Sequence, residues 1–305
     1  MKKSIYVELI KIVKKRSFMI FVCSLFLITI LLTLFLKNDF KREYIYIDES
    51  NYGNEYSEYI DYVNEENKIT EYVLNNNIDE HNNIRGSLSV SHMILTFLSL
   101  YIVILSSKSF GYEYEKNTIK WIMLNNKKKI IFFSKIISLL IISIMLVSLV
   151  YFTNLLAVNI MYDVDILDLN VLLTKNGHII EKSLLIVHSC EYLRLFFPQM
   201  LLIILSAFLG LLFKSSVASS AISIFILLSG SLVTELFIKL KLKVISYTFL
   251  PYLDFSIFQD RIGLCLYNIE NAINITQKNG VIIIIISSIL LMIIGSLIFE
   301  KRELK

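Results

Sequence analysis

The chain alternates between long apolar runs and shorter polar segments. Six runs have the length that a helix needs to cross a bilayer, at about 18–36, 88–107, 130–158, 193–213, 216–238 and 281–299. A hydrocarbon core of about 30 Å takes roughly 20 helical residues, and these runs are almost free of charged side chains. The pattern predicts six transmembrane helices in one domain over residues 1–305, and hence an all-α polytopic membrane protein.

A short amphipathic segment precedes the first apolar run. Ile5, Leu9, Ile12 and Val13 recur there at helical spacing, and lysines occupy the opposite face. This pattern is typical of an interfacial helix that lies in the headgroup layer. A merely basic segment that orients the first span would have a similar composition. We expect no cleaved signal peptide, because the first run is too long for one and five more runs follow.

Basic and acidic residues segregate between the connections. The N-terminal segment, the connection after the second run, the turn after the fourth run and the C-terminal end are basic, whereas residues 37–87 contain twelve acidic and five basic side chains. Because Lys and Arg gather on the cytoplasmic side, we expect both termini in the cytoplasm. Residues 37–87, about 159–192 and 239–280 would then lie outside. Lys239, Lys241 and Lys243 fit this orientation least well.

Composition agrees with a membrane protein. Apolar residues make up 55% of the 305 positions and charged residues only 18%, whereas a soluble domain of this length needs a more polar exterior. Within residues 37–87, tyrosines recur on one helical face, so we expect a small helical outer lobe there. Its acidic residues indicate either a receiving surface for a cationic substrate or simply a solvated surface.

Motifs for chemistry of the chain's own are missing from the sequence. It contains no G-x-x-x-x-G-K-[ST] loop and no H-E-x-x-H motif, so we expect neither an ATPase nor a zinc hydrolase. Its cysteines and histidines have no metal-ligand spacing. We therefore expect no metal, no cofactor and no nucleic-acid partner. The charged residues of the apolar runs (Lys135, Arg194 and Glu235) lie near run ends, where snorkelling to the interface explains them.

Two of the apolar runs carry a polar stripe at helical spacing. The second run contains Ser89, His92, Thr96, Ser99 and Ser106, and the fifth contains Ser216, Ser219, Ser220, Ser223, Gly230 and Thr234. A polar face in lipid must meet protein or water. These stripes therefore either line a transport path or pack closely against neighbouring helices, and both can hold in a dimer. The path residues predicted in this way are Ser89, His92, Thr96, Ser99, Ser220, Ser223 and Thr234.

The basic connection between the second and third runs is short and amphipathic. Trp121, the only tryptophan of the chain, and Leu124 make one side of residues 111–124 apolar, while the other side is charged. An apolar anchor of this kind fits a pocket on a partner protein. Alternatively, the tryptophan anchors the end of a span in the membrane interface.

The order of these features resembles the membrane subunit of type-two ATP-binding-cassette exporters, the bacterial ABC-2 family. After its second span, that family has a glutamate, a Gly-Thr-apolar-Lys sequence, a Pro-Ser-Arg turn and a further lysine. This chain matches the pattern at Glu113, Thr118, Ile119, Lys120 and Lys135. It has Asn117 in place of the glycine and Asn125-Asn126-Lys127 in place of the turn. The resemblance extends over nearly the whole chain in span count and loop sizes.

The resemblance implies a permease of the bacterial cytoplasmic membrane. A separate ATPase subunit would bind ATP and magnesium, and a second permease copy or a homologous permease would complete the transporter within membrane lipid. Residues 111–124 would form a cytoplasmic coupling helix that docks through Glu113, Thr118, Ile119, Lys120, Trp121 and Leu124. Residues 244–262 resemble the re-entrant outer hairpin of that family. The implied function is export of a peptide antibiotic, bacteriocin or drug, in resistance or immunity.

Two other classes of function are compatible with the residues. One is a self-sufficient channel or secondary transporter, which a buried and partnered charge in the middle of a span would favour. The other is a membrane-anchored sensor or assembly protein whose outer lobe is the active part.

Overall fold

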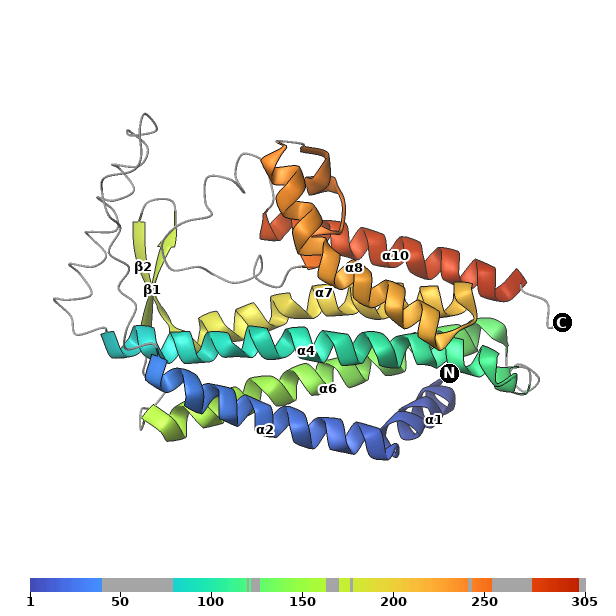
Figure 1. The fold of residues 1–305 in the computed structure, drawn as a ribbon, viewed down its shortest axis with the longest axis horizontal. Coiled ribbons are helices and arrows are strands. Elements are labelled where there is room, and N and C mark those ends of the chain that lie inside the picture. Colours follow the sequence, from blue (N-terminus) through green and yellow to red (C-terminus); the bar gives the residue numbers. More distant parts are fainter. Residues whose placement is uncertain are drawn as a thin grey trace.

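The structure is a computed structural model, and it describes residues 1–39, 79–119, 121, 127–162, 170–175, 178–240, 243–253 and 276–301. Six helices of 24 residues or more form an elongated bundle (Figure 1): α2 (Arg16–Asp39), α4 (Asp79–Glu115), α6 (Lys128–Tyr162), α7 (Leu184–Phe213), α8 (Ser216–Lys239) and α10 (Gln277–Lys301). A shorter helix, α1 (Lys2–Val13), precedes α2. Most of the expected outer lobe, residues 37–87, lies outside the described residues.

Five of the long helices are apolar enough to cross a membrane: α2, α4, α6, α7 and α10. In α8 the apolar stretch found among the described residues, Ser216–Gly230, is shorter. The prediction of a mostly helical, multi-pass membrane protein is therefore confirmed. The sixth crossing remains a prediction.

Two helices extend well beyond the apolar runs that predict them. α4 begins at Asp79 rather than near residue 88, and α7 begins at Leu184 rather than near residue 193. Hydropathy marks only the part of a helix at bilayer depth, whereas helical hydrogen bonding continues wherever other contacts stabilise the polar turns. In α7 this extension includes buried Tyr192 and His188, whose rings pack against Tyr151 of α6.

A two-stranded antiparallel hairpin stands between α6 and α7. Its strands are β1 (Asn170–Lys175) and β2 (His178–Ser183), paired residue for residue. The expectation of an all-α protein omitted this element. A local signal for it exists, because Asn176-Gly177 separates two stretches rich in β-branched residues and Asn-Gly favours tight hairpin turns.

α4 and α7 are the central helices of the bundle. α4 contacts α2, α6, α7 and α8, and α7 contacts α4, α6, α8 and α10. A Cβ atom added to Gly210 of α7 would lie 2.7 Å from the carbonyl oxygen of Ser107 in α4, and one added to Gly111 would lie 2.6 Å from the backbone nitrogen of Ser216. Glycines thus allow these backbones to touch, as small residues do between membrane helices.

The segment expected to form a re-entrant hairpin is described only in part. Two short 3-10 helices, η1 (Lys243–Tyr247) and η2 (Pro251–Leu253), follow α8 and pack against it. The Tyr252 hydroxyl donates a hydrogen bond of 3.0 Å to the carbonyl oxygen of Ser246, and burial raises the pKa of Tyr252 to about 12. Residues 254–262 lie outside the described residues.

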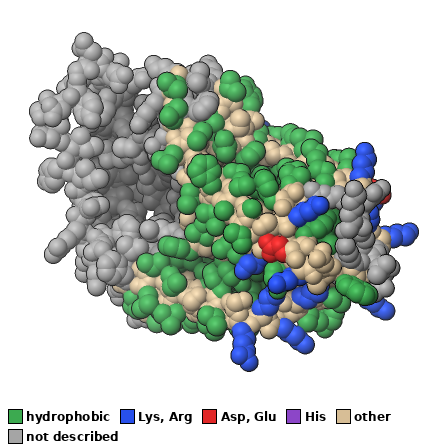
Figure 2. Space-filling view, turned by 45° about the vertical axis from the view of Figure 1, so that its right-hand side comes forward, with side chains coloured by type: hydrophobic (Ala, Val, Ile, Leu, Met, Phe, Trp, Pro, Cys, Tyr) green, Lys and Arg blue, Asp and Glu red, His purple; other side chains and the backbone are tan. Residues whose placement is uncertain are grey.

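The N-terminus, the C-terminal ends of α4 and α10 and the N-terminal end of α6 lie at one end of the bundle, and the β-hairpin lies at the other (Figure 1). We call the first the basic end. Its exposed basic residues include Lys2, Lys3, Lys14, Lys15, Arg16, Lys116, Lys127, Lys129, Lys214 and Lys301. Figure 2 shows Lys and Arg side chains gathered there beside a largely hydrophobic flank. The basic segments read from the sequence therefore lie together in space.

Candidate functional site at the basic end

Four charged side chains join α1, α4 and α6 at the basic end. The Nζ atom of Lys135 in α6 lies 2.7 Å from Oε1 of Glu113 in α4 and 3.5 Å from Oε2 of Glu8 in α1. The same ammonium donates a hydrogen bond of 3.0 Å to the carbonyl oxygen of Ser109. The Nζ atom of Lys11 lies 3.0 Å from Glu8 and 3.6 Å from Glu113. Each carboxylate therefore meets both ammonium groups, and we call these four residues the charge network.

The charge network is largely buried. The side chain of Lys135 is 1% exposed, and those of Glu8 and Glu113 are 12% and 13% exposed. A buried ammonium is strongly unfavourable unless opposite charges and hydrogen-bond acceptors surround it. Both carboxylates and the Ser109 carbonyl surround Lys135, and the ring of Phe110 lies 5.6 Å away. The explanation of Lys135 by snorkelling is therefore wrong, because its ammonium points into the protein.

Lys11 lies at the rim of the charge network. Burial lowers the pKa of the Lys11 ammonium, but the hydrogen bond and charge of Glu8 and the charge of Glu113 outweigh it, so the pKa lies above its ordinary value. Lys11 is therefore a cation at neutral pH. With two basic and two acidic members, the charge network is formally neutral, which favours its partial burial.

The first residues after α4 turn back onto the bundle. Asn117 has a φ of 55°, a left-handed conformation that asparagine adopts more readily than most residues. The glycine that the ABC-2 pattern has at this position would meet the same requirement. Two residues later, Ile119 is buried in an apolar cluster with the rings of Phe110, Phe132 and Phe299.

The residues expected to dock on a partner separate into two groups. Glu113 and Ile119 point into the bundle, so the expectation that they belong to an exposed docking surface is wrong. Residues 111–115 are also the last turn of α4 rather than part of a separate coupling helix. In contrast, Thr118 is exposed and Trp121 is 74% exposed. Two further expected residues lie outside the described residues, namely Lys120 and Leu124.

A second polar contact at the basic end joins α4 to α8. Oε1 of Glu115, the last residue of α4, accepts hydrogen bonds from the backbone N–H of Ser216 at 2.7 Å and the hydroxyl of Ser215 at 3.0 Å. Its Oε2 accepts one from the hydroxyl of Ser216 at 3.1 Å. A helix N-terminus leaves its first N–H groups unpaired and favours a negative charge. Glu115 therefore supplies the cap of α8 from another helix.

Most described members of the polar stripes face neighbouring helices. Ser99, Ser223 and Thr234 are buried, and each hydroxyl donates to a carbonyl oxygen of its own helix, at 2.6, 2.8 and 2.6 Å. Thr96 is exposed and Ser220 is half-buried. Ser89 and His92 belong to α4, but their side chains are outside the described set. Close helix packing accounts for the buried contacts, and a role in a transport path stays a prediction.

A second buried polar cluster lies toward the hairpin end. Nδ1 of His188 lies 3.9 Å from Oε2 of Glu191, and the His188 ring lies 5.3 Å from that of Tyr151 and 4.9 Å from that of Tyr192. Sequence reasoning missed this cluster because it placed residues 184–192 in an outer connection. No group of three or more His, Cys, Asp or Glu side chains able to hold a metal ion occurs among the described residues.

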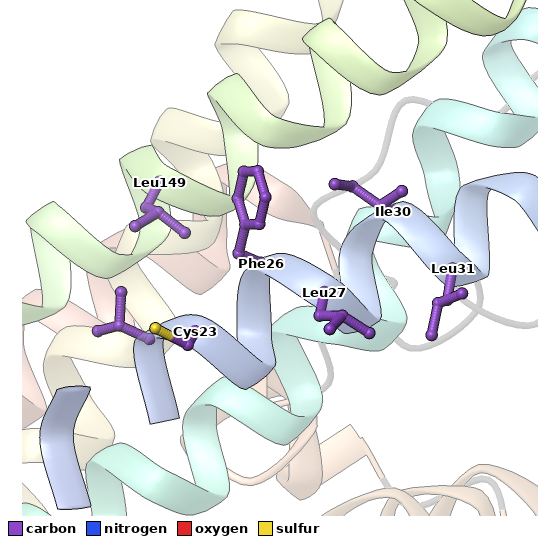
Figure 3. Close-up of a pocket in the computed structure, with 7 residues that line it drawn as sticks. Cys23, Phe26, Leu27, Ile30, Leu31 and Leu149 are labelled. Atoms are coloured by element: carbon purple, nitrogen blue, oxygen red, sulfur yellow. The ribbon is translucent and has the colours of Figure 1, made fainter. Parts of the chain in front are cut away.

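The flank formed by α2 and α6 carries an apolar groove of about 500 Å³ (Figure 3). Side chains of α2 such as Cys23 and Phe26 line it together with Leu149 of α6. The labelled lining residues carry no charged group, so this surface suits lipid hydrocarbon rather than a polar ligand. The ion pairs between described residues lie elsewhere, near the two ends of the bundle.

Residues 56–305 match a family described as a protein of unknown function (DUF2705). The chain belongs to this family. The match covers α4 to α10, including Glu113 and Lys135, whereas α1 and α2 precede it. No curated protein and no solved structure matches the chain.

Proposed function

We propose that this DUF2705 protein is the permease subunit of an ABC exporter, which moves substrate across a bacterial cytoplasmic membrane when a separate ATPase subunit drives it. The observation that carries the proposal is the exposure of Trp121, at 74%, just beyond the buried Ile119. The connection is thus anchored to the bundle by one apolar residue while it presents another outward. Tryptophan is among the residues that contribute most to binding when a partner's pocket buries them.

The contacts behind Trp121 would transmit a displacement of this connection to the helices. The charge network links the end of α4 to α1 and α6, and Glu115 links it to α8. Phe110, Phe132 and Phe299 add apolar contacts between α4, α6 and α10, with ring centroids 5.6 to 6.1 Å apart. A push on the connection would therefore move several helices together, which is what coupling to an ATPase requires.

Other parts of the proposal come from the sequence. They are a sixth span formed by α8, cytoplasmic termini, an outer lobe at residues 37–87, and a second permease copy or a homologous permease. ATP and magnesium would bind to the partner ATPase. A peptide antibiotic, a bacteriocin or a drug would be the exported substrate.

The experiment combines co-purification with ATP hydrolysis. The full chain is co-expressed with the phosphate-loop ATPase encoded nearest to its gene, and the retained ATPase is measured together with its activity. Truncating a buried tryptophan anchor typically costs about 2 kcal/mol or more, which weakens binding more than tenfold. We therefore expect Trp121→Ala to lose the ATPase at concentrations where the parent retains it.

The matched control is Tyr6→Ala, which removes an aromatic side chain that is 65% exposed at the same end of the molecule. Both variants should be as abundant in the membrane as the parent, because neither side chain belongs to the packed interior. Full retention of the ATPase by Trp121→Ala would contradict the coupling role. Hydrolysis of ATP by the purified chain alone would contradict the permease assignment.

A further inference from the structure

The charge network gives α1 an outward surface with charges of a single sign. Glu8 is the only acidic residue among residues 1–17. Its carboxylate is turned toward Lys11 and Lys135 and is only 12% exposed. The same side of α1 carries the buried side chain of Ile12 and is joined to α6 by a hydrogen bond of 3.0 Å between the hydroxyls of Ser4 and Ser134. No acidic side chain therefore remains on the opposite side of α1.

That opposite side combines lysines with exposed apolar groups. Helical spacing places residues 2, 3, 6, 7, 10, 13 and 14 on it. Its lysines are Lys2, Lys3 and Lys14, all exposed, and its exposed apolar residues are Tyr6, Val7 and Val13. We call these six residues the outer face of α1. An outer face of this composition suits a membrane interface, where negatively charged headgroups lie above a less polar layer.

The position of α1 places this outer face at a membrane boundary. α1 ends at Val13, the membrane-spanning α2 begins at Arg16, and the two helices are inclined to each other (Figure 1). A helix joined so closely to the end of a span lies at the depth of the lipid headgroups. The charge network fixes its rotation about its own axis, so the outer face is oriented before any ligand binds.

We propose that the outer face of α1 binds anionic phospholipid headgroups. The ammonium groups of Lys2, Lys3 and Lys14 pair with phosphate oxygens, and Tyr6 and Val7 contact the glycerol layer beneath. Charge complementarity carries the choice of ligand, because every charged residue of the outer face is a lysine. Each basic residue near an anionic membrane surface raises the local preference by about fivefold. The proposal is independent of the ATPase and of transport.

The test places a fluorescent reporter on the outer face of the full-length chain. Trp121→Phe removes the native tryptophan, and Tyr6→Trp introduces one on α1. The purified protein is reconstituted in phosphatidylcholine vesicles that contain a defined share of brominated phosphatidylglycerol or brominated phosphatidylcholine, both of which quench tryptophan on contact. We expect brominated phosphatidylglycerol to reach half-maximal quenching at a fraction of the vesicle lipid at least about fivefold lower than brominated phosphatidylcholine does.

Two charge-matched variants decide whether the outer face is responsible. Replacing Lys2, Lys3 and Lys14 by glutamine should make the two brominated lipids equally effective. Replacing Lys116, Lys127 and Lys301 by glutamine removes the same charge from exposed positions of the basic end outside α1, and should leave the preference intact. Equal quenching by both lipids in the parent overturns the proposal. Equal loss of the preference in both variants also overturns it, because the selectivity would then belong to the whole basic end.

Discussion

Replacing Lys135 by methionine tests the charge network directly. Methionine keeps much of the apolar length of the lysine side chain, but it removes the ammonium that Glu113, Glu8 and a backbone carbonyl share. Two carboxylates that are 12% and 13% exposed then retain only Lys11, whose Nζ lies 3.6 Å from Glu113. Removing one partner of a buried ion pair costs about 3–5 kcal/mol. Because Lys11 remains, we expect a loss of about 3 kcal/mol in the free energy of unfolding.

The assay is the loss of folded protein on heating in detergent, followed by size-exclusion chromatography. The matched control is Lys129→Met in the same helix, where Nζ lies 3.2 Å from Glu300 but the lysine side chain is 60% exposed. Exposed pairs of this kind contribute about 0–1 kcal/mol. The double variant Lys135→Met with Glu113→Gln removes an unpaired charge as well, and should recover much of the lost stability.

Two results would refute this reasoning. If Lys135→Met and Lys129→Met melt at the same temperature, the charge network contributes no more than an exposed ion pair. If the double variant is no more stable than Lys135→Met, the loss comes from packing around methionine and not from an unpaired carboxylate. The double variant keeps the test informative even if Lys135→Met does not accumulate.

The remaining predictions concern helix packing and orientation. Gly210→Ala should destabilise the protein by about 1–3 kcal/mol through overpacking, because the new Cβ atom would lie 2.7 Å from the Ser107 carbonyl oxygen. Gly230→Ala is the control, because a Cβ atom added there would lie 3.3 Å from its nearest neighbour. Melting temperatures of Gly210→Ala and Gly230→Ala compare the two, and an equal loss would contradict the close approach of α4 and α7. In a cysteine-free background, Lys182→Cys should react with an impermeant thiol reagent in intact cells, and Lys116→Cys only after the membrane is opened. Labelling of position 116 from outside would reverse the proposed orientation.

Local composition was sufficient for the outline of the fold. A helix crosses a bilayer because its own side chains are apolar and its backbone hydrogen bonds are internal, so a window of about 20 residues contains the information. The same holds for α1, whose apolar positions recur at helical spacing. The hairpin of β1 and β2 was also within reach, since Asn176-Gly177 is a local signal.

By itself, the sequence determined where the apolar helices lie, that α1 is amphipathic, and how charge divides between the connections. Only the tertiary structure decided that Lys135 is buried with Glu113 and Glu8 rather than extended to the interface, and that Glu115 caps α8. The contacts of Lys135 with Glu8 and of Glu115 with Ser216 join residues about a hundred or more positions apart, and these residues meet because helix packing brings particular helix ends to one place. Periodicity shows which face of a helix is polar, but not which other helix faces it. The free energy of burying a charge depends on that neighbour, and therefore on the assembled bundle.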